Sequence, residues 1–262
     1  MIQQKTFVND LQKLRDQAPL IHNITNYVVM NSTANALLSV GASPVMAHAS
    51  EEMEEMVTIA SALVLNIGTL SEKWIEAMHL AGKAAKRKGK PVILDPVGAG
   101  ATTLRDNATK SIVETIKPQV IRGNASEILA VAKAESSTKG VDSTVSADDA
   151  LEVARELARQ TGSVVSVSGR TDYITDGKTT HEVSNGHHLM GKITGTGCSA
   201  TALTAAFAAV QEDYLTAATE AMLVMGIAGE MAGEEADAPG TFQVKFLDAL
   251  YKINEEEIKN RM

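Results

Sequence analysis

A glycine-rich turn that runs directly into a small-residue helix is the segment of this sequence best suited to chemistry. It reads GKITGTGCSA over residues 191–200, and residues 199–210 are rich in Ala, Leu and Phe. Glycine adopts backbone angles closed to other residues, so a ligand can approach the main chain there. The N–H groups at such a helix start, those of Gly195, Thr196 and Gly197, form a predicted anion hole. Cys198, the one cysteine of the chain, lies on its rim. Phosphate beside a proton acceptor is the arrangement that a kinase needs.

Other interpretations of the turn are open at the level of the motif. Residues 195–200 fit the loose G-x-G-x-x-A dinucleotide fingerprint, but residues 187–191 before it are not an apolar strand. An acidic residue that closes a second strand about 20 positions later is also missing. The Walker pattern G-x-x-x-x-G-K-[ST] is absent from the chain. The plainest alternative is a glycine turn that serves only tight packing.

Charged side chains follow two predicted strands at the points where those strands end. Asp95 closes one of them, and Arg122 closes the next, with Glu127 in the first turn of the following helix. Open α/β sheets bind ligands at the carboxyl ends of their strands. Carboxylates for a hydrated Mg²⁺, an arginine for phosphate charge and an anion-binding helix start are the parts of phosphoryl transfer. Each acid alone also fits a structural role, Asp95 as the cap of a turn and Glu127 as a partner of the helix dipole.

Short apolar runs alternate with amphipathic helices along the chain, which favours a mostly parallel sheet with helices on its faces. We predict strands over residues 44–46, 62–67, 91–95, 119–122 and 163–168, and a hairpin around residues 176–177. We predict helices around residues 7–14, 26–40, 71–89, 105–117 and 125–133, and almost continuously from residue 197 onward. Ser50 is the expected cap of an acidic helix, residues 137–146 an expected loop, and Ser146 with Asp149 an expected capping box. Because the composition shows no break, we expect residues 1–262 to form a single domain.

Composition excludes several classes of protein. A chain of 262 residues can bury a large core, and its net charge of −8 argues against a nucleic-acid surface. A single cysteine rules out an internal disulfide and a cysteine-based zinc site, in keeping with a reducing cytosol. Apolar runs stay well short of the 18 residues that a membrane span needs. We therefore expect a cytoplasmic protein with neither a membrane nor a nucleic acid as partner.

Five segments, in this order and spacing, resemble the hydroxyethylthiazole kinase family of the ribokinase-like superfamily. They are IHNITNYV at 21–28, ASPVMAH at 42–48, LDPVGAG at 94–100, RGNASE at 122–127 and GTGC at 195–198. The resemblance covers essentially the whole chain, and the positions that the family uses for binding show no departure. It implies a ribokinase-like, three-layer α/β/α fold.

The resemblance also implies a reaction, which is ATP-dependent phosphorylation of the hydroxyl of 4-methyl-5-(2-hydroxyethyl)thiazole, a salvage step towards thiamine. The matching positions imply Met46 and Gly195 as contacts of the thiazole, Arg122 and Ser168 as contacts of ATP, and Asp95 with Glu127 around Mg²⁺ and its waters. Most ribokinase-like enzymes have an aspartate base after the second glycine, where this family and this chain have cysteine. Cys198 is therefore the expected catalytic residue, and a thiol at a helix N-terminus can have a lowered pKa. The family resemblance further implies a homotrimer with the thiazole site between subunits.

Two other functions stay open on the sequence alone. One is a related pyrimidine or sugar kinase on the same fold. The other is a nucleotide- or thiazole-sensing protein that has lost catalysis, which the intact set of Asp95, Arg122, Glu127 and Cys198 disfavours.

Overall fold

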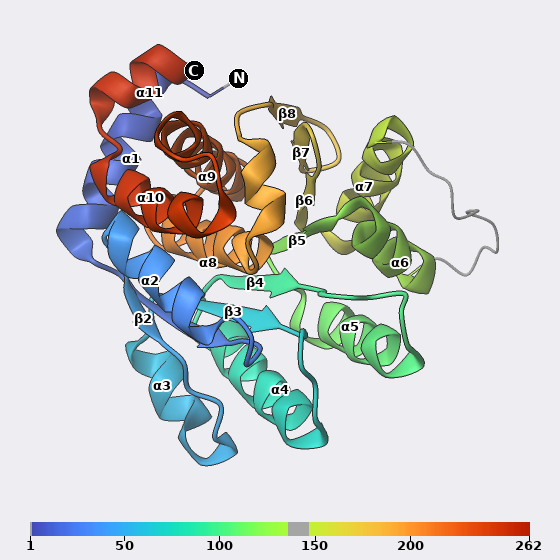
Figure 1. Ribbon diagram of the computed structural model, residues 1–262. Helices are drawn as coiled ribbons and strands as arrows, with labels where there is room; N and C mark the ends of the chain where they lie inside the picture. The colour runs from blue at the N-terminus through green and yellow to red at the C-terminus, as the bar shows by residue number, and fades with distance from the viewer. Residues whose placement is uncertain (1, 136–146) are drawn as a thin grey trace.

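The structure, a computed structural model, describes residues 2–135 and 147–262. The described residues form an eight-stranded sheet in the order β2-β1-β3-β4-β5-β6-β7-β8 (Figure 1). The strands are β1 (Leu20–Ile24), β2 (Ser43–Val45), β3 (Ala62–Asn66), β4 (Val92–Asp95), β5 (Val120–Asn124), β6 (Val164–Ser168), β7 (Asp172–Thr175) and β8 (Thr180–Val183). Pairing is parallel from β2 to β6, and β7 and β8 are added antiparallel. A parallel sheet brings the carboxyl ends of its strands to one edge, where ligands bind.

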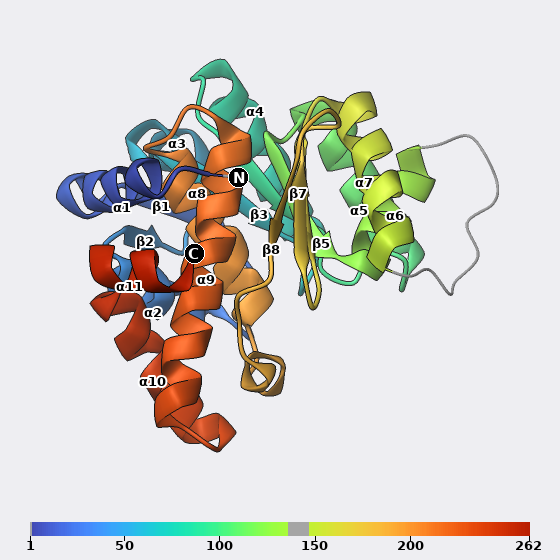
Figure 2. The same ribbon diagram turned by 90° about the horizontal axis from the view of Figure 1, so that it is seen from above.

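Helices cover both faces of this sheet (Figure 2). One layer holds α3 (Met53–Ile59), α4 (Glu72–Arg87), α5 (Thr103–Ile116), α6 (Ala125–Glu135) and α7 (Ala147–Thr161). The other holds α1 (Gln4–Gln17), α2 (Met30–Val40), α8 (Thr196–Ala208), α9 (Tyr214–Glu235), α10 (Pro239–Lys252) and α11 (Glu255–Arg261). Two short 3₁₀ segments, η1 (Ser50–Glu52) and η2 (His188–Lys192), complete the described elements. The three-layer α/β/α architecture expected from the sequence is confirmed.

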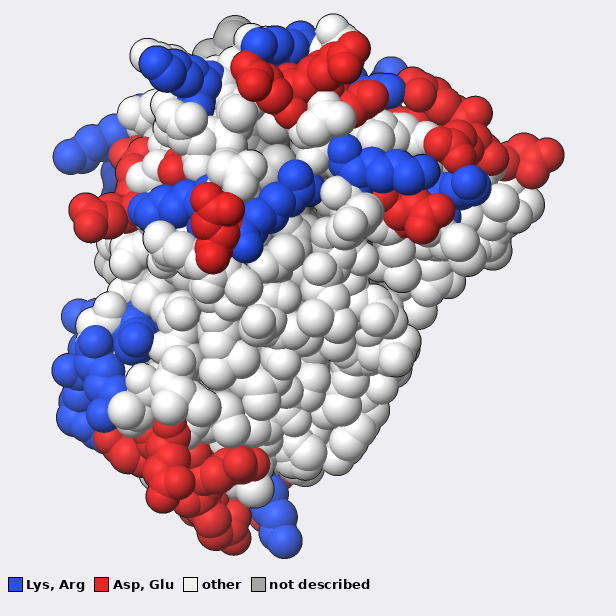
Figure 3. Space-filling view, turned by 90° about the vertical axis from the view of Figure 1, so that its left-hand side faces the viewer, with Lys and Arg blue, Asp and Glu red and all other residues white. Residues whose placement is uncertain are grey.

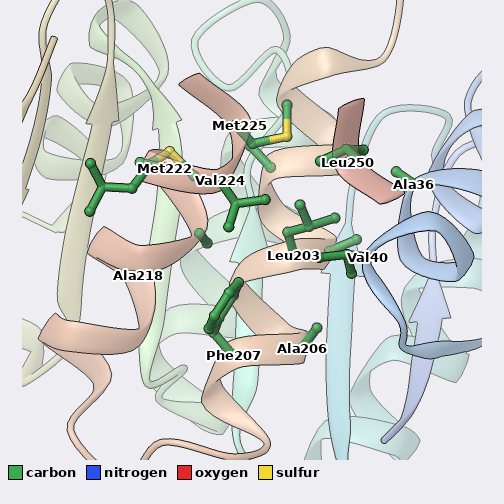
Figure 4. Close-up of a cluster of buried hydrophobic side chains, with 14 of the residues drawn as sticks. Ala36, Val40, Leu203, Ala206, Phe207, Ala218, Met222, Val224, Met225 and Leu250 are labelled. Atoms are coloured by element: carbon green, nitrogen blue, oxygen red, sulfur yellow. The ribbon is translucent and has the colours of Figure 1, made fainter. Parts of the chain in front are cut away.

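Alternation along the central strands explains the two layers. In β3, Leu63 and Leu65 pack into the core beneath α3–α7, whereas Ala62 and Val64 pack under α8 and its neighbours. Strands buried on both faces read as continuous apolar runs, which is why this strand was visible in the sequence. Figure 4 shows the second core, where side chains of α2, α8, α9 and α10 meet.

Helix α9 is long and apolar enough to cross a membrane by length and composition alone. In the structure, 83% of its apolar window is buried inside the protein. It therefore serves as a core helix, packed between α8 and α10 (Figure 1).

Most predicted elements are present, with three differences. Strand β1 was missed, because its polar residues His22 and Asn23 interrupt the apolar pattern although both are fully buried. The helix predicted from residue 26 begins only at Met30, because residues 25–29 form an irregular turn. Ser50 caps no helix: it lies inside η1, and the N-cap residue of α3 is Glu52. The loop predicted over residues 137–146 and the cap predicted at Ser146 lie outside the described residues.

Candidate active site

The carboxyl edge of the sheet collects the predicted charged residues. Asp95 is the last residue of β4, and Asn66, the last residue of β3, is its partner in the strand register. Arg122 lies in the next strand, β5, and Ser168 closes β6 beside it. The parallel register therefore aligns four polar side chains along one edge, with the start of α8 packed over β3 and β4.

Asp95 is a buried carboxylate in which one of the two oxygens accepts hydrogen bonds from neighbouring side chains. Its Oδ2 atom accepts hydrogen bonds from Asn66 Nδ2 at 2.8 Å and from Thr201 Oγ1 at 2.9 Å. The pKa of Asp95 is raised to about 6, mainly by burial and also by the neighbouring Glu127, against a lowering by Arg122 and by the hydrogen bonds from Thr201 and Asn66. When burial and a second acid raise the pKa of a carboxyl group, a cation bound beside it would stabilise its ionised form.

Arg122 and Ser168 lie together, as the resemblance implied for the ATP contacts. Arg122 is only 8% exposed, and its Nη2 donates to Ser168 Oγ at 2.7 Å. Its Nε is buried and has no hydrogen-bond partner among the described residues. The Arg122 side chain also lines the large cavity, where a guanidinium is suited to a phosphate oxygen.

The predicted anion hole is an open helix N-terminus. Gly195 is the N-cap residue of α8, with a positive φ of 86° that favours glycine, and none of the described side chains caps this end. A Cβ atom at Gly197 would lie 2.7 Å from Arg122 Nη1, so glycine here lets the helix start approach the guanidinium without displacing it. The first amides of α8 and Arg122 therefore converge on the same space. The preceding element is η2 rather than a strand, so this junction differs from those at Asp95 and Glu127.

A cavity of about 700 Å³ opens in front of this group. Its lining includes the polar and cationic groups of Arg122, Ser168 and Thr196 together with the thioethers of Met222 and Met225. Such a mixed lining suits a ligand that has both an anionic part and a flat ring.

Cys198 lies in the first turn of α8, where its Sγ is 3.5 Å from Asn26 Nδ2. The lowered pKa expected for this thiol is wrong. Burial, helped by the Asp95 carboxylate, raises the pKa of Cys198 to about 11, and the Asn66 and Asn26 amides and Arg122 offset this only in part. Desolvation of the thiolate is the largest of these effects.

Glu127 has a structural role that the sequence analysis weighed as an alternative. Its Oε1 accepts from the Gly98 amide and its Oε2 from the Asn124 amide, both at 2.9 Å. Asn124 Oδ1 in turn accepts from the Glu127 amide at 2.9 Å, so the two side chains cap α6 reciprocally. The carboxylate nevertheless lies near enough to Asp95 to raise its pKa.

The two residues implied for the thiazole lie in different parts of the chain's surface. Met46 follows β2, the edge strand of the sheet, whereas Gly195 packs against Ser32 and Val29. A second cavity beside Gly195, lined also by Ser32, Thr196 and Phe246, measures only about 20 Å³. Met46 lines neither cavity.

Sequence reasoning missed three polar residues of the site, namely Asn26, Asn66 and Thr201. Asn66 could have been found, because it closes a buried strand in the way that Asp95 does. Thr201 is hidden in an Ala-rich helix, and its bond to Asp95 spans 106 positions of the chain. The position of Asn26 depends on the irregular turn before α2.

The sheet, the acid at the end of β4 and the open start of α8 define a kinase of the ribokinase-like class. The model of the hydroxyethylthiazole kinase family matches residues 11–256. A hydroxyethylthiazole kinase from Leptospira biflexa is 56% identical over 258 residues, which cover 98% of this chain and 97% of that protein. A solved hydroxyethylthiazole kinase structure from Pyrococcus horikoshii OT3 has a TM-score of 0.91 and 47% identity, covering 97% of this chain and 96% of the other.

The chain therefore belongs to the hydroxyethylthiazole kinase family, and the predicted enzyme class is confirmed. A ribokinase-like superfamily protein from Enterococcus faecalis has a TM-score of 0.66 at 13% identity, covering 97% of this chain and 96% of that one. At that identity the likeness supports the fold alone. The roles assigned above to individual residues stay predictions.

Proposed function

We propose that this kinase binds ATP in the 700 Å³ cavity and transfers its terminal phosphoryl group to the hydroxyl of 4-methyl-5-(2-hydroxyethyl)thiazole at the start of α8. The observation that carries the proposal is the convergence of Arg122 with the uncapped amides of α8 in the lining of that cavity. A polyphosphate placed there meets a fixed cation and a helix N-terminus, which together stabilise charge on the transferring group.

The residues present fit Mg²⁺ as the partner of ATP. The described residues hold no cluster of three or more His, Cys, Asp or Glu side chains that could bind a metal alone. Mg²⁺ in kinases is commonly held by one or two carboxylates together with substrate phosphates and waters. Asp95, whose Oδ2 is occupied by two donors, would offer Oδ1, and Glu127 would act through water because two amides already occupy its oxygens. Bound there, the ion would neutralise charge on the phosphates.

The chain's own groups would then divide the work. Arg122, braced by Ser168, would orient the phosphates, and the amides of Thr196 and Gly197 would hold the transferring group. Cys198 is the proposed acceptor of the hydroxyl proton, at 3.5 Å from Asn26. A loose phosphoryl transfer demands little of a base, because the acceptor proton leaves late, so a weakly acidic thiol is tolerable.

A second copy of the chain would complete the thiazole pocket. The cavity beside Gly195 has about the volume of one water molecule, so it cannot enclose a thiazole by itself. Met46 lies at the edge of the sheet, away from that cavity's lining, and would approach a ring held at Gly195 of a neighbouring subunit. We therefore retain the homotrimer, with substrate sites between subunits, as part of the proposal.

A broad uncharged face supports this assembly. No Lys, Arg, Asp or Glu occurs between Asp16 and Glu51 in the sequence, a segment that contains all of α2 and β2. Figure 3 shows a wide surface without charged side chains on the side of the molecule where α2 and β2 lie in Figure 1. Val28 and Leu38 in this segment are 65% and 58% exposed, and Val244 on the neighbouring α10 is 60% exposed. Apolar side chains exposed on an uncharged face are typical of a subunit interface.

The reaction is tested by coupled ADP release with three acceptors, namely the thiazole alcohol, hydroxymethylpyrimidine and ribose. We expect the thiazole alcohol to have by far the highest kcat/KM. Comparable turnover of the pyrimidine or the sugar would instead support the related kinase considered above.

We place the activity in the cytoplasm and in one domain spanning residues 1–262, in keeping with the lone cysteine and the family match over 11–256.

The assembly is tested by light scattering on size-exclusion fractions. Leu38→Glu should dissociate the trimer and raise the KM for the thiazole alcohol. Leu104→Glu, an equally exposed leucine on α5 in the opposite helix layer, is the matched control and should stay trimeric. A monomeric wild-type chain with full activity would refute the shared site.

A further inference from the structure

A chain of buried amides links the turn before α2 to Asp95. Asn26 Nδ2 donates to Asn66 Oδ1 at 2.9 Å, and Asn66 Nδ2 donates to Asp95 Oδ2 at 2.8 Å. Asn26 is 4% exposed, and Asn66 and Asp95 are each 1% exposed. Asn26 donates to Asn66, and Asn66 donates to Asp95, so the orientation of one side chain fixes that of the next.

The two ends of this series of hydrogen bonds reach different parts of the proposed site. At one end, Asn26 Oδ1 accepts from the Val28 amide at 3.1 Å, and Asn26 Nδ2 lies 3.5 Å from Cys198 Sγ. At the other end, Asp95 Oδ2 receives the Asn66 amide and the Thr201 hydroxyl together. Both donors meet Oδ2, so Oδ1 takes part in neither of these two hydrogen bonds.

We propose that Asn66 is a positioning residue that couples the acceptor end of the site to the metal end. Its donated bond holds Asp95 with Oδ1 presented to the metal, and its accepted bonds hold Asn26 and the Gly68 amide, and with them the turn that borders Cys198. Thr201 shares only the first of these two tasks. The inference rests on the proposed function in one respect, which is the assignment of Asp95 to the metal.

The two tasks predict different outcomes for two near-isosteric changes. Thr201→Val removes one donor from Asp95 and should weaken the Mg²⁺-dependent part of ADP binding about tenfold, with the KM for the thiazole alcohol unchanged. Asn66→Leu removes both tasks and should weaken that part of ADP binding about ten- to hundredfold and also raise the KM for the thiazole alcohol. ADP binding in EDTA should stay at the wild-type value in both variants.

The chain offers a matched control for each change. Thr204 lies in the same helix, is fully buried, and donates only to the Ala200 carbonyl at 2.8 Å. Asn23 is a buried strand asparagine whose amide donates to the Ile21 carbonyl instead of a carboxylate. Thr204→Val and Asn23→Leu test for general loosening of the core, and we expect both to bind MgADP as the wild type does.

The experiment is calorimetric titration of the full-length variants with ADP in Mg²⁺ and in EDTA, beside steady-state kinetics for the acceptor. Should Asn66→Leu fail to fold, Asn66→Ser, whose hydroxyl cannot span both partners, replaces it. The quantity compared is the gain in ADP affinity in Mg²⁺ over that in EDTA. If Asp95→Asn loses this gain but the Asn66 and Thr201 variants keep it, the inference alone is overturned. If the gain survives in Asp95→Asn, the metal assignment is overturned, and the inference with it. Equal losses in the control variants would show a packing role only and also overturn it.

Discussion

The Cys198 thiol offers the sharpest test of the proposed chemistry, because its surroundings contradict the usual expectation for a cysteine at a helix start. The thiol is largely buried, and its pKa is raised to about 11. At pH 8 a group with that pKa is ionised in only about one molecule in 10³. The structure therefore limits how much a thiolate base can contribute.

That limit gives a magnitude for Cys198→Ala. General-base catalysis contributes about 10²- to 10⁴-fold when the base is ionised. Scaled by the thiolate fraction, the contribution at pH 8 is about tenfold at most. We expect Cys198→Ala to lose no more than this in kcat, with both KM values near those of the wild type.

The pH dependence follows from the same raised pKa. The population of thiolate grows tenfold per pH unit until the pH reaches about 11, so wild-type kcat should rise relative to Cys198→Ala between pH 6 and 9. Cys198→Ser, which keeps the size and the contact with Asn26 but does not ionise in this range, should follow Cys198→Ala. Cys198→Asp, with a more acidic group at this position, should match or exceed the wild type.

The assay is coupled ADP release at saturating Mg²⁺, measured for the four proteins from pH 6 to 9. A loss of about 10³-fold or more in Cys198→Ala at pH 7 would refute the argument from a neutral thiol. Identical profiles for the wild type and Cys198→Ala would remove Cys198 as proton acceptor, leaving catalysis to the helix start and Arg122.

Four further changes test other parts of the site and fold. Glu127→Gln should lower activity more at low than at high Mg²⁺, and also lower Tm, because the carboxylate caps α6; an unchanged Mg²⁺ dependence would leave only the capping role. Arg122→Ala should raise the KM for ATP, since a charge-assisted phosphate contact is worth about 1.5–3 kcal/mol; a change confined to the thiazole KM would contradict the assignment. Met46→Ala should raise the thiazole KM and spare ATP, and equal losses for both ligands with a lower Tm would indicate packing. Glu220 is fully buried beside Asp10, and its pKa is raised to about 9 by burial, so native protein should lose about 1.4 kcal/mol of stability per pH unit as pH rises from about 4.5 towards 9. Glu220→Gln should remove that slope in urea unfolding at pH 5, 7 and 9, and a parallel slope in both proteins would show that Glu220 is ionised when folded.

The parts of the fold that were predictable are those in which one sequence pattern has one structural meaning. Strand β4 was predictable from an apolar run that ends in an aspartate, and a helix was expected after it. The position of Glu127 was predictable from its place in the first turn of α6. Strand β1 was unpredictable because His22 and Asn23 are buried polar residues in its middle. His22 Nε2 bonds to the Ala47 carbonyl and Asn23 Nδ2 donates to the Ile21 carbonyl, whereas His22 Nδ1 and Asn23 Oδ1 have no hydrogen-bond partner among the described residues. Polar residues of this kind look like loop residues in a sequence.

Within the site, sequence reasoning found charges and missed the neutral groups that orient them. Asp95, Arg122 and Cys198 are conspicuous by type. Asn66 also closes a buried strand, but its bond to Asp95, like that of Thr201, comes from the register of β3 with β4 and from the packing of α8 on both. The raised pKa of Cys198 was hidden for the same reason, since it comes from burial and from a carboxylate 103 positions away in the printed sequence. Long-range register is the information that local patterns lack.

The distribution of charge in the molecule matches the chemistry of its two substrates. The cavity proposed for the nucleotide is lined by Arg122, Arg170 and Asp172, which suit a polyanion with hydroxyl groups. The face proposed for the thiazole belongs to a segment without a single Lys, Arg, Asp or Glu, as a neutral heteroaromatic ring requires. Thr196, the first residue of α8, lines both the large cavity and the small one. In the proposed mechanism the helix start is therefore where the apolar alcohol and the phosphoryl group would meet, and its amides would stabilise the charge that develops in the transfer.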